Sequence, residues 1–240
     1  FPTRCSSDLG ATASVFVEAP FTPPTVNPVT GDWVVNGAEA STPVVITGSH
    51  APGVTALTLT IDTVTVPVTL GASNTWQASI TPAQWQAIGD GPATLTVTNG
   101  GTGGGAAATH QMTVDLTPPR VTFNAVSGND LVAMTETNVV VSGDAPGAVR
   151  VTVQIGAGAP QLAQVAVDGS WTTTFTTMGT LGPHQLTARA TDAAGNEGAA
   201  VHSYTVVLID LTGSASADTL SLELLGVNDA AAAPLLATSP

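Results

Sequence analysis

Lysine is absent from the 240-residue sequence, and its four arginines are the only strongly basic side chains. Seventeen Asp and Glu residues oppose them, which gives a formal net charge of −13. A field of that sign repels nucleic-acid phosphates and anionic lipid headgroups, so we expect no nucleic-acid partner and no anionic membrane surface as a partner. The lack of lysine also excludes catalysis through a lysine amine.

Long apolar runs are missing too. No stretch of 18 apolar residues occurs, so the sequence predicts no membrane span, and no basic segment precedes an apolar one as in a signal peptide. Because the chain begins with Phe1, we interpret it as an internal fragment. Charged residues make up only 9% of the chain, so the surface must consist mainly of Thr, Ser, Asn, Gln, Gly and Ala.

Cysteine occurs once, as Cys5. Residues 1–9 resemble the translation of a sequencing adapter, so we interpret them as an artefact and leave them out of the fold prediction. Without Cys5 the chain has no cysteine. A repeat that lacks cysteine, lysine and N-glycosylation sequons fits a secreted protein that does not use disulfides.

The segment Asp115-Leu116-Thr117-Pro118-Pro119 separates two Thr/Val-rich blocks of similar sequence. Thr22-Pro23-Pro24 and Asp210-Leu211-Thr212 each lie 95 residues from their counterparts in it. Three such segments at one spacing predict a tandem array. We therefore expect the end of a preceding repeat at 10–19, a first repeat at 20–115, a second at 116–210, and the truncated start of a further module at 211–240.

Apolar and polar residues alternate with period two throughout both repeats, which is typical of short antiparallel strands. The predicted strands include Val44–Thr47, Leu57–Ile61, Val64–Val68, Trp76–Ile80, Ala93–Thr98, Val139–Ser142 and Gln185–Ala190, with Val15–Val17 ending a preceding repeat and Leu220–Leu224 in the last module. About seven strands per repeat predict an all-β fold of tandem immunoglobulin-like β-sandwiches in an extended array.

One helix is predicted, at Thr81–Ile88. Thr81 suits the N-cap, Pro82 the first helical position and Gly89 the stop. Trp76 and Trp171 begin equivalent strands and are predicted to point into the two cores. Trp33 and Trp85 have no counterparts in the second repeat, so two interpretations stay open for them, a cap on the core or a platform for a sugar ring.

The Thr-Pro-Pro segments, Asp168-Gly169-Ser170-Trp171 and Thr191-Asp192-Ala193-Ala194-Gly195-Asn196 together resemble the bacterial Ig-like repeats of very large surface adhesins, over roughly residues 10–212. The resemblance implies a secreted, extracellular array at the bacterial cell surface that serves cell adhesion and biofilm formation without catalysis. It also implies contacts with neighbouring repeats of the same chain, a glycan or protein ligand at an absent tip domain, and often calcium at the junctions. The Gly-rich segment 99–105 replaces the Asp-Ala-Ala-Gly-Asn turn in the first repeat.

Calcium takes six to eight oxygen ligands, so a few carboxylates with carbonyls would form a site. In a sandwich the 192–196 turn and Asp144 lie where the chain enters, whereas Glu39 and Asp90 lie at the exit of the first repeat. We expect these groups to converge on the segment between the repeats. The candidate ligands are Asp115, Asp192, Asn196, Asp144, Glu39 and Asp90. The alternative is that the turn residues only bond their own backbone.

No motif predicts an enzyme. Serine-hydrolase motifs and paired catalytic acids are missing, and His50, His110, His184 and His202 are not at metal-ligand spacing. The alternative to an adhesin rod is an Ig-like accessory or carbohydrate-binding module of a secreted polysaccharide-active enzyme. It would hold a glycan through Trp33 or Trp85.

Overall fold

The computed structural model describes residues 22–100, 105–209 and 224–225. The residues interpreted as an adapter artefact, the predicted strand at 15–17 and most of the last module lie outside these ranges. The chain divides into two compact units, which are Phe1–Val34 with Ala40–Val114 and Val35–Glu39 with Asp115–Pro240. The predicted repeat boundaries stay a prediction.

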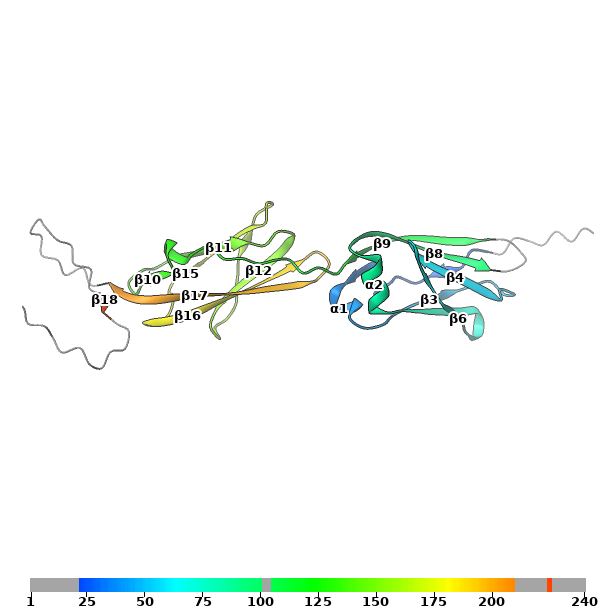
Figure 1. Cartoon of the computed structure of the whole chain (residues 1–240), viewed down its shortest axis with the longest axis horizontal. Helices are drawn as coiled ribbons and strands as arrows, with labels where there is room; N and C mark the ends of the chain where they lie inside the picture. The colour runs from blue at the N-terminus through cyan, green and yellow to red at the C-terminus, as the bar shows by residue number, and fades with distance from the viewer. Residues whose placement is uncertain (1–21, 101–104, 210–223, 226–240) are drawn as a thin grey trace, which may run out of the picture. The chain divides into compact units, whose positions relative to one another are not determined.

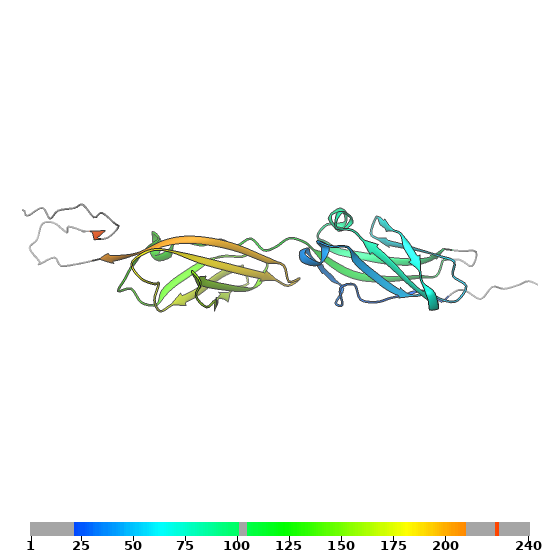
Figure 2. The ribbon, with the colours of Figure 1, turned by 90° about the horizontal axis from the view of Figure 1, so that it is seen from below.

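The first unit is a sandwich of two sheets (Figures 1 and 2). One has the order β1-β3-β7-β6 and the other β2-β9-β8-β4-β5. The strands are β1 (Thr25–Val26), β2 (Val34–Asn36), β3 (Val44–Ser49), β4 (Ala56–Ile61), β5 (Val64–Val66), β6 (Val68–Leu70), β7 (Thr75–Ile80), β8 (Gly91–Gly100) and β9 (Ala107–Asp115). The helices are α2 (Pro82–Ile88) and the 3-10 turn η1 (Ala72–Asn74), and α1 (Gly37–Ala40) follows β2. Residues Val35–Glu39 of β2 and α1, and Asp115 at the end of β9, are grouped with the second unit.

The second unit has sheets of order β11-β15-β14 and β10-β17-β16-β12-β13, with β18 paired to β17. Its elements are η2 (Val126–Gly128), β10 (Leu131–Ala133), β11 (Val139–Asp144), β12 (Ala148–Ile155), β13 (Gln161–Leu162), β14 (Gln164–Val165), β15 (Ser170–Phe175), β16 (Gly182–Asp192), β17 (Glu197–Ile209) and β18 (Leu224–Leu225). The neighbouring pairs are antiparallel except β10 and β17, which are parallel.

Strand order is the same in the two units, since β2-β9-β8-β4-β5 corresponds to β10-β17-β16-β12-β13. The place of β1 is taken in the second unit by residues 122–124, where Asn124 N donates to Ser142 O at 2.9 Å, as Asn27 N donates to Thr47 O at 2.9 Å in the first. The predicted all-β, immunoglobulin-like sandwich fold is confirmed.

Side-chain alternation places the core of each unit between its sheets. In β7, Trp76, Ala78 and Ile80 are buried and the residues between them are exposed. Trp171 lies in the equivalent strand of the second unit, 2% exposed, and meets Phe123 edge-on with ring centroids 5.2 Å apart. Both tryptophans therefore anchor a core, as predicted.

Pro67 divides what the sequence predicts as one strand, Val64–Val68. The structure has β5 before it and β6 after it, in different sheets. Proline lacks the N–H that a continuing ladder would need, and it is confined to edges and breaks in sheets. The chain therefore changes sheets at this residue.

Helix α2 begins and ends where the sequence predicts. Thr81 caps it with a reciprocal hydrogen-bond pair to Gln84, Pro82 opens the first turn, and Gly89 follows the last residue at φ +78°. In Figure 2 the helix is seen nearly along its axis, beside the strands of the first unit. Its Trp85 is 0% exposed, so the helix closes one side of that core.

Candidate functional site

The turn between β16 and β17 holds two of the predicted calcium ligands, Asp192 and Asn196. They are buried, at 8% and 5% exposure. Asp192 Oδ1 accepts a hydrogen bond from Asn196 N and Oδ2 accepts one from Asn196 Nδ2, both at 2.9 Å. These two bonds close the turn.

Asn196 also bonds two other backbone groups of the second unit. Its Nδ2 donates to Asp115 O at 2.9 Å, and its Oδ1 accepts from Gly37 N at 2.7 Å. The Asp115 side chain accepts from Thr117 N at 3.4 Å. The structure therefore brings Asp115, Asp192 and Asn196 into one hydrogen-bonded group, with the backbone of Asp115 as its contact.

Glu39 forms a local cap. Its Oε2 accepts a hydrogen bond from Asn36 N at 3.0 Å, and its own N donates to Asn36 Oδ1 at 2.9 Å. Asn36 Nδ2 in turn donates to Ala194 O at 3.2 Å, which places the start of α1 beside the Asp192–Asn196 turn within the second unit. Glu39 is thus held by Asn36, the residue that precedes α1.

The two remaining candidate calcium ligands, Asp144 and Asp90, come from other segments of the chain. Asp144 is exposed at the end of β11, where its backbone pairs with Thr122. Asp90 belongs to the first unit. Within residues 22–100, 105–209 and 224–225, no three His, Cys, Asp or Glu side chains are grouped closely enough to hold a metal. Calcium binding by these residues stays a prediction.

The sugar-platform interpretation is wrong for Trp85, because a fully buried ring cannot stack on a sugar. Trp33 is half-buried, and one face of its indole stacks on His110 with centroids 4.6 Å apart and planes 11° apart. Only the remaining exposed part of Trp33 could meet a ligand.

Asp130 and His202 form a contact that the sequence analysis did not predict. His202 Nε2 lies 2.7 Å from Asp130 Oδ1, and the same oxygen accepts a hydrogen bond from Val126 N at 2.8 Å. The hydrogen bond from His202, and next the one from Val126, lower the pKa of the Asp130 carboxyl against the opposing effect of burial. A shared pattern could have found this site, because His-x-x-Thr-Val begins at both His110 and His202.

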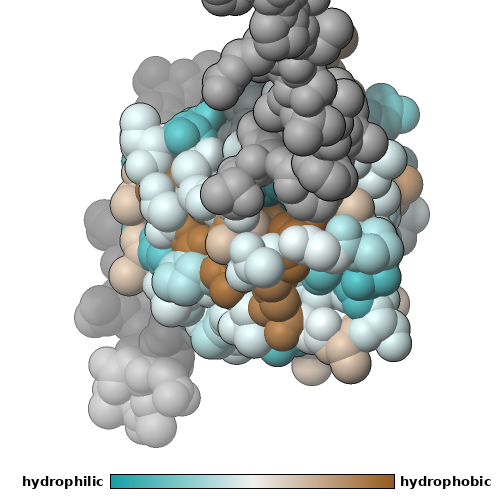
Figure 3. Space-filling model, turned by 90° about the vertical axis from the view of Figure 1, so that its right-hand side faces the viewer, coloured by the Kyte–Doolittle hydropathy of each residue, from teal (hydrophilic) through white to brown (hydrophobic). Residues whose placement is uncertain are grey.

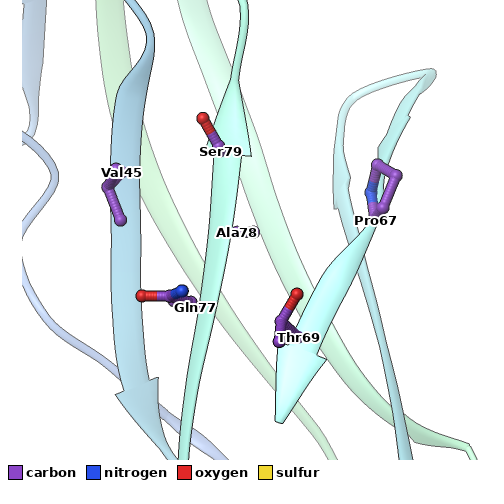
Figure 4. Close-up of a pocket in the computed structure, with 6 residues that line it drawn as sticks. All are labelled: Val45, Pro67, Thr69, Gln77, Ala78 and Ser79. Atoms are coloured by element: carbon purple, nitrogen blue, oxygen red, sulfur yellow. The ribbon is translucent and has the colours of Figure 1, made fainter. Parts of the chain in front are cut away.

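Figure 4 shows a pocket of about 290 Å³ on the outer face of the β3-β7-β6 sheet. Val45 comes from β3, Gln77 and Ser79 from β7, and Thr69 from β6, with Pro67 at the sheet edge. Its lining is uncharged. Each unit also has a groove on its smaller sheet. The groove of the first unit is lined by Asn27, Thr47, Gly48 and Trp76 among others, and that of the second by Asn124, Ser142, Gly143 and Trp171 among others.

Figure 3 looks at the end of the first unit. Apolar residues gather near the middle of this face, and polar residues surround them. In the part of the chain that the structure describes, no helix is long and apolar enough to cross a membrane.

Comparison with known proteins finds a family model that matches the second unit. Residues 124–211 match the model described as a bacterial Ig-like domain. The predicted resemblance is therefore confirmed. No curated protein sequence matches the chain.

Three solved structures are similar to the chain. A 1.5-MDa bacterial ice-binding adhesin is 25% identical, with 79% of this chain and 65% of that one covered and a TM-score of 0.47. A Ca²⁺-stabilised adhesin with which an Antarctic bacterium binds ice is 27% identical, with 79% and 49% covered and a TM-score of 0.47. A bacterial immunoglobulin-like domain from the M. primoryensis ice-binding adhesin is 27% identical, with 41% and 100% covered and a TM-score of 0.31. The chain thus spans less than two thirds of the first two.

Proposed function

We propose that the chain is a structural and adhesive rod segment of a secreted bacterial surface adhesin and serves cell adhesion and biofilm formation. The repetition of one strand order in two units, the second a bacterial Ig-like domain, carries this proposal. Repeats of this kind add length and stability unit by unit. Their role is to hold a ligand-binding tip domain, which lies outside this chain, at a distance from the cell surface.

The polar groups of the best candidate site support a structural role. Asp192 and Asn196 use their side chains to close a turn, and Asn196 also bonds the backbone of Asp115 and Gly37. Such satisfied groups stabilise a fold, whereas a catalytic group must be left able to meet a substrate. The partners in this proposal are neighbouring Ig-like repeats.

Calcium is a second part of the proposal. Carboxylate oxygens can accept more than one contact each, so Asp115 and Asp192 keep lone pairs that a hard cation could use. Ca²⁺ would add to the hydrogen bonds that already hold Asn196. It would stabilise the turn without any chemical step.

Attachment of cells that express the parent protein tests the role. In-frame removal of the two units should weaken attachment and thin the biofilm while the rest of the protein still reaches the cell surface. Insertion of two unrelated sandwiches of the same length should restore attachment, because only reach is required. Failure of that replacement would show that these units bind a specific ligand.

The accessory-module alternative now depends on Trp33. A glycan array with the unaltered chain and with Trp33→Ala separates the two functions. The adhesin proposal expects no glycan signal from either protein. A signal that disappears in Trp33→Ala would favour the carbohydrate-binding module instead.

A further inference from the structure

The turns that precede β2 and β10 have the same local structure. Trp33 N donates to Val29 O at 3.0 Å, and Asp130 N donates to Val126 O at 2.8 Å. Trp33 and Asp130 both have positive φ, +67° and +62°. Neither is a glycine, and bulky residues rarely adopt this conformation, so the surrounding contacts must hold it in place.

The last strand of each unit bonds the backbone of that turn. Thr113 N donates to Trp33 O and Thr205 N donates to Asp130 O, both at 2.9 Å. These amides therefore report whether the last strand is attached to the turn. The two attachments occupy equivalent places in the fold.

In the last strand of each unit, a histidine lies three residues before the threonine whose N–H bonds the turn. In the second unit His202 Nε2 bonds Asp130 Oδ1 at 2.7 Å, and in the first unit His110 stacks on the Trp33 ring. Two different side chains at one position thus meet an imidazole. A carboxylate favours a protonated imidazole by charge, and an indole face favours it through a cation–π interaction.

The groups around His202 and His110 are compatible with a protonated imidazole. Phe123 stacks on the His202 ring at 5.2 Å and carries no charge. Asp130 is the carboxylate bonded to His202, and Glu136 accepts a hydrogen bond from Ser127 Oγ in the same turn. In the first unit Asp32 precedes Trp33 and bonds Val34 N at 3.0 Å. Of these carboxylates, Asp130 is the one in contact with an imidazole, and its negative charge favours a positive charge on His202.

We propose that the His202–Asp130 and His110–Trp33 contacts are clasps that tighten on acidification. Protonation of either histidine fastens the last strand of its unit to the turn before the neighbouring strand. Histidine is the side chain whose charge changes between pH 5 and 8. The clasps are properties of the fold and do not depend on the adhesin proposal.

Amide hydrogen exchange in the full chain tests the clasps. Exchange of the Thr205 and Thr113 amides would be measured at about pH 5.5 and about pH 7.5 and corrected for the intrinsic effect of pH. Both side-chain pairs are partly exposed, so we expect protection to rise by about two- to fivefold at the lower pH. Equal protection at the two pH values would overturn the proposal.

Glutamine variants supply matched controls. His202→Gln keeps a neutral donor that cannot titrate, so the pH dependence at Thr205 should disappear while that at Thr113 stays. His110→Gln should have the opposite pattern. A pH dependence at Thr205 that survives His202→Gln would also overturn the proposal, and the measurement on the unaltered chain decides the question if a variant fails to fold.

Discussion

Two core tryptophans at equivalent positions differ in one hydrogen bond. Trp76 Nε1 donates to Thr25 O at 3.0 Å, whereas Trp171 Nε1 is buried without an acceptor among the described residues. A buried N–H group without an acceptor destabilises the folded state, so a substitution that removes this group relieves that cost. The same substitution should therefore have different costs at the two sites.

Phenylalanine at each site measures this difference. Trp76→Phe and Trp171→Phe remove the same ring volume, but only the first removes a hydrogen bond. We expect Trp76→Phe to lower the free energy of unfolding by about 1 kcal/mol more than Trp171→Phe. Urea denaturation of both variants gives the comparison, and equal losses would mean that Trp171 has a water partner.

Gly48 lies where no side chain fits. A Cβ there would lie 1.9 Å from Thr25 O and 2.6 Å from the indole nitrogen of Trp76. We expect Gly48→Ala to destabilise the first unit by about 1–3 kcal/mol, because backbone and a packed ring must both move. Gly100→Ala is the control, since its nearest contact would be at 3.5 Å, and thermal unfolding should hardly change.

Because its hydroxyl is buried, Tyr204 should make the folded chain less stable in alkali. Its buried hydroxyl donates to Met178 O at 2.6 Å, and burial raises its pKa to about 12. The unfolded chain loses this proton near the ordinary pKa of about 10, so the contribution is complete below that pH. The free energy of unfolding should fall as the pH rises from about 10 to about 12.

The chain has a single tyrosine, so its absorbance change on ionisation reports Tyr204 alone. The titration should have its midpoint near pH 12 in the folded chain and near 10 in denaturant. Tyr204→Phe should remove this part of the alkaline loss. A midpoint near 10 in the folded chain would contradict the predicted burial effect.

Among the elements, helix α2 is the one that a single sequence predicts best. Its cap, first-turn proline and stop are all local signals within nine residues. The β7 strand is also predictable, because Trp76, Ala78 and Ile80 alternate with polar residues. Local chemistry of this kind does not require knowledge of which segments are neighbours.

Removal of the α2 cap tests its contribution. Thr81→Ala deletes the side chain that accepts from Gln84 N, and it should lower the stability of the first unit by about 1 kcal/mol. Gln86→Ala, at an exposed position of the same helix, serves as the control and should change little. Calorimetry of the two variants would show the difference, and equal melting temperatures would mean that packing of Trp85 alone holds the helix.

Other elements could not be predicted because they depend on distant partners. The parallel pairing of β10 with β17 joins residues more than 70 positions apart, and period-two alternation does not reveal it. The short helix α1 arises from a reciprocal pair of bonds between Asn36 and Glu39. The break at Pro67 was readable in principle, since proline is disfavoured inside a ladder.

For the whole molecule, the sequence predicted the fold and the repeated plan better than the site. The sequence analysis named Asp192 and Asn196 as candidate calcium ligands, but it could not show their hydrogen bonds, which depend on where Gly37 and Asp115 lie. The His202–Asp130 contact was missed because its two residues belong to separate local patterns. Side chains that meet through tertiary structure leave a weak trace in one sequence.

Calcium is tested on the whole chain. If Ca²⁺ binds at Asp115 and Asp192, millimolar Ca²⁺ should raise the melting temperature of the second unit by roughly 4 to 8 °C over chelator. Asp115→Asn should abolish the rise, whereas Asp144→Asn serves to ask whether that exposed residue takes part. Identical melting curves with Ca²⁺ and with chelator would leave the hydrogen bonds of Asn196 as the stabilising interaction.

The parallel pairing of β10 and β17 determines how the second unit resists a force that pulls on its two ends. The chain reaches β10 soon after it enters the unit and leaves from β17, so a pull on both ends drags these two neighbours in opposite directions. The rungs from Leu131–Thr205 to Ala133–Val207 are then sheared together instead of being unzipped one after another. The backbone bond from Thr205 N to Asp130 O and the side-chain contact of His202 with Asp130 lie beside these rungs and would have to break with them.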